Sequence, residues 1–336
     1  MAGNDLVAGH VFFYFFPDIS PTMRVSCRKM RTKLIIQISR NIHSRVPALL
    51  AVLAMTACSA SAQTPAPAAA ASPRERIEGF TDTPMLPGGK WHQHDPNRPQ
   101  PPVVTPGAIS SEGATPPSDA EVLFDGKDLS KWQGGLEKDP NWKDQPASWK
   151  VQDGYVEVSP PDGTDIRTRG KWSDFQLHIE WATPNPPTGH GQARGNSGIE
   201  INGMYEIQVL DSYNDKTYPD GQAGALYGQM PPLVNPSKPP GEWQTYDIIW
   251  ESPRWDDKGE MTQKPKLTVI YNGVLVQHGT EPIGRTEGIG AGVEYKAKPF
   301  FKPHDPAVFI QLQNHHSNPV RFRNIWIRDL NLAERA

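Results

Sequence analysis

The stretch FQLHIEW, Phe175–Trp181, alternates apolar and polar residues with a period of two. Successive side chains of an extended strand point to opposite faces, so such a stretch is typical of a strand with one apolar face. The residues predicted to face a core are Phe175, Leu177, Ile179 and Trp181. The polar face carries His178 and Glu180, and Glu180 is a candidate substrate-binding residue unless this face is merely solvated.

Many other short stretches repeat this pattern, separated by clusters of Gly, Pro, Asn and Asp. Between two of them, Asn272-Gly273 predicts a tight hairpin, because both residues accept the positive φ angles of a type I′ turn. Almost nothing is typical of a long amphipathic helix. The predicted fold is all-β, with two packed antiparallel sheets. The predicted strands are 149–152, 155–158, 175–181, 197–201, 205–210, 244–250, 266–271, 274–278, 308–313 and 321–328.

The charge balance narrows the class of ligand. The 336 residues carry 34 basic and 37 acidic side chains, a formal net charge of −3. This composition offers no basic field for nucleic acid, and it favours a small neutral substrate or a sugar.

The N-terminal third differs in composition from the rest of the chain. Basic residues precede the apolar run 46–57, which is the order of a secretion signal, and the residues before Met23 or Met30 indicate an over-extended start. The stretch MTAC, Met55–Cys58, resembles a bacterial lipobox with a lipid on Cys58, whereas Ala60–Ala62 is a competing cleavage site. We therefore expect a signal region over 1–62 and an exported protein, in the periplasm, on the cell envelope as a lipoprotein, or secreted. Its only contact with a membrane would be that lipid.

Residues 63–117 are rich in Ala, Pro, Ser and Thr, which predicts a disordered, semi-extended tether. His92 and His94 lie in it, and a partly docked linker explains them better than a metal site. The folded domain is expected over 118–336. Both cysteines, Cys27 and Cys58, precede it, so burial of a core must stabilise this domain without disulfides.

The stretch YEIQVLDS, Tyr205–Ser212, is the strongest candidate for the site. Glu206 and Gln208 share one face of the expected strand. A bulge at Val209-Leu210 would return Asp211 to that face. The spacing resembles the bulged Glu-x-Asp-x-x-Glu strand of jelly-roll β-glucanases, but Gln208 and Asp211 replace the Asp and the second Glu, which argues against an ordinary retaining glycosidase.

Further candidates lie near other strand ends. The stretch GNSG places Asn196 and Ser197 at a strand entrance, although a plain turn explains them equally well. Gln313 and His315 end a strand, where a histidine suits proton transfer near neutral pH or simply belongs to a surface loop. Most of the tryptophans are expected in the core, and Trp243 is the one expected near a ligand.

Six ordered stretches between residues 120 and 331 together resemble the 3-keto-disaccharide hydrolase family. They are LFDGKDLSKW (123–132), GNSGI (195–199), YEIQVLDS (205–212), GALYG (224–228), PGEW (240–243) and VRFRNI (320–325). The resemblance implies a concanavalin A-like (jelly-roll) sandwich and an exported bacterial enzyme that cleaves glycosides already oxidised to a ketone at sugar carbon 3. Where the family usually has LQDHG, this chain has Asn314 and His316, and its loop 184–194 looks longer.

The implied chemistry is β-elimination followed by addition of water, because the ketone acidifies the hydrogen on carbon 2. On this hypothesis Glu206 is the base and Asp211 or His315 the acid, while Asn196, Gln208 and Gln313 position the substrate. No cofactor and no metal site are predicted. A divalent cation such as calcium at the carboxylates is an open alternative for stabilising the enolate. The rival functions are a non-catalytic, lectin-like carbohydrate-binding module and a structural surface lipoprotein.

Overall fold

The computed structural model describes residues 77–108, 110–134, 145–159, 164–286, 301, 303–315 and 318–332. The expected signal region, Cys58 and the first part of the expected tether, 63–76, lie outside the described residues. All described residues belong to one unit, Ala70–Ala336. Within them, no helix combines the length and the apolar character needed to span a bilayer.

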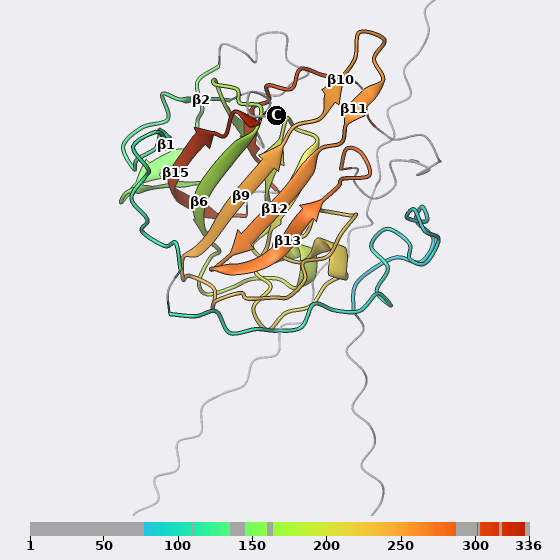
Figure 1. Ribbon diagram of the computed structural model, residues 1–336. Helices are drawn as coiled ribbons and strands as arrows, with labels where there is room; N and C mark the ends of the chain where they lie inside the picture. Colours follow the sequence, from blue (N-terminus) through green and yellow to red (C-terminus); the bar gives the residue numbers. More distant parts are fainter. Residues whose placement is uncertain are drawn as a thin grey trace, which may run out of the picture. The chain divides into compact units, whose positions relative to one another are not determined.

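Two antiparallel sheets form the body of this unit (Figure 1). The larger sheet has the strand order β13-β12-β9-β6-β15-β4-β3, with β1 paired to β15. Its strands are β1 Glu121–Phe124, β3 Lys150–Gln152, β4 Tyr155–Glu157, β6 Phe175–Ala182, β9 Gln244–Glu251, β12 Lys266–Tyr271, β13 Val274–Thr280 and β15 Arg321–Asp329.

The smaller sheet has the order β2-β5-β14-β7-β8. Its strands are β2 Trp132–Gln133, β5 Ile166–Thr168, β14 Ile310–Leu312, β7 Ser197–Ile201 and β8 Tyr205–Val209. A separate hairpin pairs β10 Arg254–Trp255 with β11 Met261–Gln263, and the short 3-10 helices are η2 Gly191–Ala193 and η3 Pro219–Gly221.

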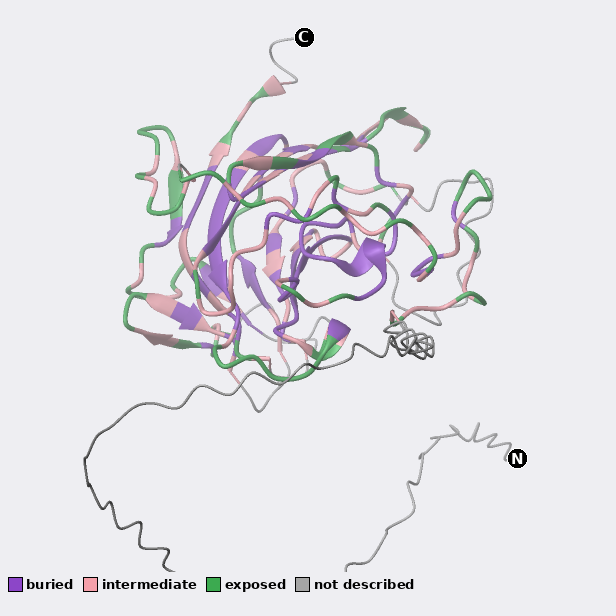
Figure 2. Ribbon diagram, turned by 90° about the horizontal axis from the view of Figure 1, so that it is seen from below, coloured by how far each residue is buried: buried purple, intermediate pink, exposed green. Residues whose placement is uncertain are grey.

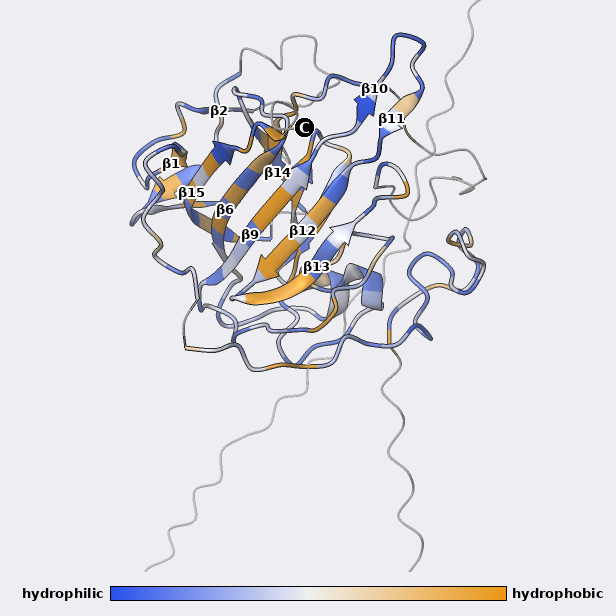
Figure 3. Ribbon diagram, in the orientation of Figure 1, coloured by the Kyte–Doolittle hydropathy of each residue, from blue (hydrophilic) through white to orange (hydrophobic). Residues whose placement is uncertain are grey.

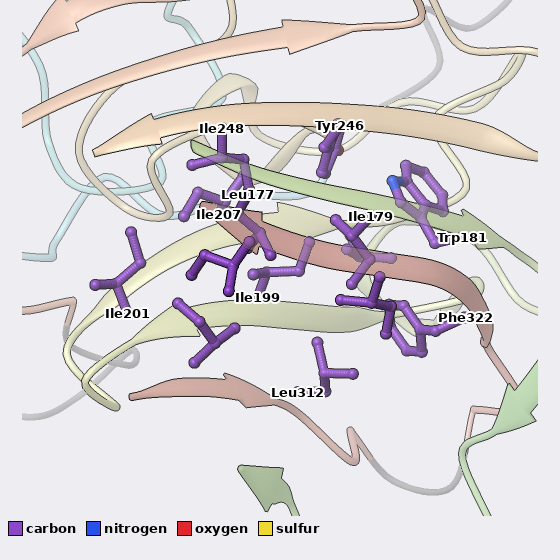
Figure 4. Close-up of a cluster of buried hydrophobic side chains, with 14 of the residues drawn as sticks. Leu177, Ile179, Trp181, Ile199, Ile201, Ile207, Tyr246, Ile248, Leu312 and Phe322 are labelled. Atoms are coloured by element: carbon purple, nitrogen blue, oxygen red, sulfur yellow. The ribbon is translucent and has the colours of Figure 1, made fainter. Parts of the chain in front are cut away.

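The core lies between the two sheets. Leu177, Ile179 and Trp181 of β6 belong to one buried cluster with Ile199 of β7 and Ile207 of β8 (Figure 4). All five side chains are at most 1% exposed, and burying each contributes roughly 1.5–3 kcal/mol. The buried residues concentrate in the strands, where hydrophobic residues also gather, whereas the connecting segments are more exposed and hydrophilic (Figures 2 and 3).

The all-β sandwich predicted from the sequence is confirmed, and each predicted strand has a counterpart. The predicted hairpin is also confirmed: Tyr271 pairs with Val274, and the two residues between them have φ angles of 49° and 78°. The strands that the sequence did not reveal are short, namely β1, β2, β5, β10 and β11.

Residues 77–108 and 110–117, which we call the N-terminal strap, differ from the expected disordered tether because they lie against the sandwich. Val104 N donates to the carbonyl of Asn235 at 3.0 Å, and Gly113 N donates to Glu180 Oε1 at 2.6 Å. Backbone groups without a regular ladder are thus satisfied by the folded domain.

The polar face of β6 was expected to be exposed, but the strap covers it. His178 and Glu180 are both 0% exposed. Ser111 Oγ donates to Asp247, which accepts from His178 Nδ1 at 2.8 Å, and Glu180 accepts from Gly113. The polar face of this strand is therefore buried under the strap and offers no groove.

Candidate functional site

A row of polar residues crosses the outer face of the smaller sheet. Gln311 of β14 pairs with Arg167 of β5 on one side and with Glu200 of β7 on the other. Glu200 in turn pairs with Glu206 of β8. Register partners share a face, so two carboxylates stand side by side on neighbouring strands.

A cavity of about 310 Å³ opens over this row. It brings together five residues singled out from the sequence, which are Asn196, Glu206, Gln208, Gln313 and His315. It also contains residues that the sequence analysis missed, which are Glu200, Gly203, Met204, Tyr227, Arg285 and Thr286.

Hydrogen bonds to both backbone groups of Glu206 hold this residue in place. Its N–H donates to Thr286 Oγ1 at 3.1 Å, and its carbonyl accepts from Tyr227 N at 3.0 Å. Its side chain lies over Gly198, where a Cβ would stand 2.8 Å from Glu206 Oε1. The glycine of the GNSG stretch therefore leaves the space that this carboxylate occupies.

Replacing Gly198 by alanine is expected to displace the Glu206 carboxylate by a few tenths of an ångström or more. Activity on the substrate proposed below should then fall by about 10- to 100-fold, because small misplacements of a reacting group are costly. The control is Gly107→Ala, where a Cβ meets nothing within 4 Å and the backbone conformation suits alanine. Equal activity of Gly198→Ala and wild type in a steady-state assay would contradict the prediction.

Burial and mutual repulsion set the charge of the two glutamates. Burial raises the pKa of Glu200 to about 7, and the charge of Asp165 adds to this. Burial raises the pKa of Glu206 well above its ordinary value, as do the charges of Glu200 and Asp165. Two adjacent carboxylates of this kind share a proton near neutral pH, so one acts as an acid while the other remains a base.

Amide side chains decide which member of the pair is charged. Gln311 Nε2 donates to Glu200 at 2.8 Å and to Asp165 at 2.9 Å, and Gln313 Nε2 donates to Glu200 at 3.3 Å. These donors favour the anion of Glu200. With its amide nitrogen turned toward Glu206, Gln208 donates to Glu206 Oε1 at 3.2 Å, so Glu206 has one amide donor and Glu200 has two. Because Glu206 is also the more buried carboxylate, we assign the shared proton to it.

Two amide oxygens in the lining are buried and, within the part of the chain that the structure describes, have no hydrogen-bond partner. They are Asn196 Oδ1 and Gln313 Oε1. Asn196 is held from its other side, because its Nδ2 donates to the carbonyl of Gln192 at 2.8 Å. Buried acceptors of this kind match ligand groups that donate, such as sugar hydroxyls.

The predicted bulge at Val209-Leu210 is wrong. Strands β7 and β8 pair without a shift in register, from Ile201 opposite Tyr205 to Ser197 opposite Val209. Strand β8 ends at Val209. Asp211 does not line the cavity. Its carboxylate accepts from Arg194 Nε at 2.7 Å, and its N–H donates to the Arg194 carbonyl at 3.2 Å. Asp211, which was expected to be the acid, is thus engaged in a buried ion pair with Arg194.

Three other sequence candidates also lie outside the cavity lining. Glu180 belongs to the larger sheet and accepts from Arg323 Nε at 2.7 Å. Trp243 stacks with the same arginine, whose guanidinium carbon is 4.0 Å from the ring centre. Ser197 supports the site from behind, because its Oγ donates to the Gln313 carbonyl at 2.7 Å.

One of the missed residues carried a usable signal. In the stretch SGIEI, Ser197–Ile201, Glu200 is the charged residue at an alternating position, on the same face as Gly198. Tyr227, Arg285 and Thr286 come from irregular segments, whose periodicity predicts nothing. Among the described residues, no group of three or more His, Cys, Asp and Glu side chains is placed to hold a metal ion.

The model of the 3-keto-alpha-glucoside-1,2-lyase-like domain matches residues 119–328, which contain both sheets and the cavity. The chain belongs to this family. The family resemblance inferred from the six sequence stretches is thereby confirmed.

Two relatives place the family in context. A 3-keto-disaccharide hydrolase of Bacteroides thetaiotaomicron is 28% identical over 173 residues, 40% of this chain and 54% of that protein, so the chain spans about half the length of this curated relative. The crystal structure of a candidate glycosyl hydrolase from Parabacteroides distasonis is 48% identical, with a TM-score of 0.58, over 69% of this chain and 93% of that one.

The exoplasmic or lumenal domain of VIP36 aligns more distantly, with 10% identity and a TM-score of 0.33 over 64% of this chain and 93% of that chain. This likeness is too remote to bear on function.

Proposed function

We propose that this domain cleaves glycosides that carry a ketone at sugar carbon 3, by elimination followed by addition of water. The observation that carries the proposal is the pair Glu200 and Glu206, two facing carboxylates with raised pKa values in one cavity. Perturbed carboxylates of this kind mark general acid and base catalysis. Membership of the family and the Bacteroides relative support the choice of a 3-keto sugar.

A sugar fits the chemistry of the cavity wall. The amide oxygens of Asn196 and Gln313 accept from hydroxyl groups, and Tyr227 adds an aromatic surface. The cavity volume of about 310 Å³ lies at the lower end of the usual range for small-ligand sites, so it suits a monosaccharide unit.

The proposed reaction balances with these groups alone. A base takes the proton from carbon 2, and that electron pair forms the double bond between carbons 1 and 2. The bond from carbon 1 to the glycosidic oxygen breaks, and the leaving oxygen receives a proton from an acid. Water then adds to carbon 1 and a proton returns to carbon 2, so the net reaction is hydrolysis.

The environment of each group suggests its role. Glu200, whose anion is held by two amides, is the proposed base, and the protonated Glu206 is the proposed acid. This revises the expectation that Glu206 is the base, because its deeper burial favours the protonated form. Arg285 supplies positive charge for the enolate oxygen, and His315 at the rim is a second proton carrier.

The test is incubation of the purified protein with 3-keto-trehalose or 3-keto-lactose. Chromatography measures the released 3-keto sugar, which is 3-keto-glucose from the first substrate and 3-keto-galactose from the second. We expect release from the ketone forms and none from trehalose or lactose, whose carbon 2 hydrogen is not acidic. Cleavage of both forms would indicate an ordinary glycosidase. Binding of the ketone form without release by the wild-type protein would favour the lectin-like alternative.

A further inference from the structure

The N-terminal strap lies outside the family-matched residues 119–328, yet it places a histidine directly behind the cavity. His94 is 0% exposed. Its ring centre lies 4.1 Å from that of Tyr218 and 4.9 Å from that of Tyr227, and Tyr227 lines the cavity. A segment that the family model does not include therefore contacts the wall of the site.

Asp220 holds this histidine in one orientation. The backbone N–H of His94 donates to Asp220 Oδ2 at 2.9 Å, and its Nδ1 faces Asp220 Oδ1 at 3.3 Å. A carboxylate at Nδ1 keeps the proton there and fixes the orientation of the ring. His94 Nε2 is buried and, among the described residues, has no hydrogen-bond partner.

Leaving a buried nitrogen of this kind without a hydrogen bond is unfavourable. Packing alone does not account for it, since an apolar ring of similar size would fill the same space without that cost. Unlike an apolar ring, the imidazole at this position can be held in one orientation by Asp220.

The two tyrosines that contact His94, Tyr218 and Tyr227, are linked by hydrogen bonds to Glu206, the candidate acid. The hydroxyls of Tyr218 and Tyr227 lie 2.7 Å apart. Tyr227 N donates to the Glu206 carbonyl at 3.0 Å, and the next residue, Gly228, donates to the Asp220 carbonyl at 2.9 Å. One short segment thus joins the partner of His94 to the strand that carries Glu206.

The chain leaves room for this insertion. Gly228 has a φ angle of 70°, and a Cβ there would stand 2.5 Å from Gln93 Nε2 and 3.3 Å from His94 Cε1. Only glycine accommodates both this backbone conformation and the approach of the strap.

We propose that His94, held by Asp220, is a positioning residue supplied by the strap, which fixes Tyr227 and through it Glu206 for the reaction. The kinetic part of this inference rests on the proposed function. His94 does not touch the substrate, and it acts through the Tyr218–Tyr227 pair.

The decisive variant is His94→Phe, which retains a ring against the tyrosines but loses both nitrogens. We expect kcat on the 3-keto-glycoside to fall by about tenfold with KM changed less than threefold, because binding surfaces remain while the reacting group is displaced. The matched control is His92→Phe, two residues away in the strap, where the imidazole Nδ1 contacts the Thr83 carbonyl instead. This control should stay within twofold of wild type.

Two further variants keep the inference testable if His94→Phe folds poorly. His94→Gln retains a side-chain N–H donor for Asp220 and should recover part of the lost kcat. Asp220→Asn weakens the same contact from its other side and should lower kcat in the same way. An equal loss in His94→Gln and His94→Phe, or an unchanged kcat in both, would overturn the proposal.

Amide hydrogen exchange gives a readout that needs no turnover. In His94→Phe the amides of Tyr227 and Gly228 should exchange at least several-fold faster than in His92→Phe. If the wild-type protein releases no 3-keto-glucose, the proposed function fails, and this exchange measurement still decides the role of His94. Exchange that is the same in both variants would show that His94 does not position Tyr227.

Discussion

Replacing Glu206 by glutamine is expected to lower kcat for release of 3-keto-glucose by about 10³-fold or more. Glutamine has nearly the same shape and leaves the backbone hydrogen bonds to Thr286 and Tyr227 in place. It neither gives nor takes a proton, and a positioned acid or base contributes about 10²–10⁴-fold. The measurement is single-turnover release from 3-keto-trehalose at saturating substrate.

The fold should not suffer from this change. Glu206 is 8% exposed and repelled by Glu200 and Asp165, so a neutral side chain at this position removes an unfavourable burial. We expect the Tm of Glu206→Gln to equal or exceed that of wild type at pH 8. The control is Glu121→Gln, an exposed residue of β1 in the other sheet. Activity within tenfold of wild type would remove Glu206 from the mechanism.

Replacing Glu200 by glutamine is expected to lower kcat/KM by about 10²–10⁴-fold, because it removes the proposed base. In the wild-type protein kcat/KM should rise with pH through an apparent pKa of about 7, as Glu200 loses its proton. A pH–rate profile over pH 5–9 checks this limb. A profile that is flat on the acid side would contradict the assignment of Glu200 as the base.

The same residue links stability to pH. Its pKa in the folded protein, about 7, lies above its ordinary value of 4.5, so the folded state binds the proton more tightly than the unfolded state. The contribution of Glu200 to stability should therefore be greatest below pH 4.5 and fall as the pH rises through 7. At pH 8 Glu200→Gln should unfold roughly 7–14 °C above wild type, with little difference between the two near pH 4. A variant that is less stable than wild type at pH 8 would refute this linkage.

The sequence predicted the strands because their periodicity is a local property. Phe175–Trp181 alternates strictly, and its apolar residues enter the core as expected. The same alternation marked Glu206 and Gln208, which do line the cavity, whereas the sequence analysis missed Glu200 although it occupies an alternating position in Ser197–Ile201. Sequence patterns therefore found one carboxylate of the pair but not the other, because they do not give the register between the two strands.

The errors arose where a polar residue had a partner outside its own strand. Asp211 carries the right chemistry, but Arg194 claims its carboxylate, and no local pattern predicts that ion pair. Glu180 alternates correctly, yet the strap and Arg323 bury it. Proline-rich composition predicted a disordered tether over 63–117. This prediction failed for the strap, because composition does not reveal that the folded domain offers hydrogen bonds to it.

The sequence by itself determined the all-β class, the family and one catalytic candidate, since alternation and ordered stretches are properties of neighbouring residues. Only the tertiary structure decided that Glu200 stands beside Glu206, that Asp211 is withdrawn into an ion pair, and that His94 lies behind Tyr227. The physical reason is that strand register and the docking of the strap bring together residues that are between 6 positions apart, for Glu200 and Glu206, and 133 positions apart, for His94 and Tyr227. Once these residues are adjacent, their charges shift one another's pKa values. A single stretch of sequence does not show this effect.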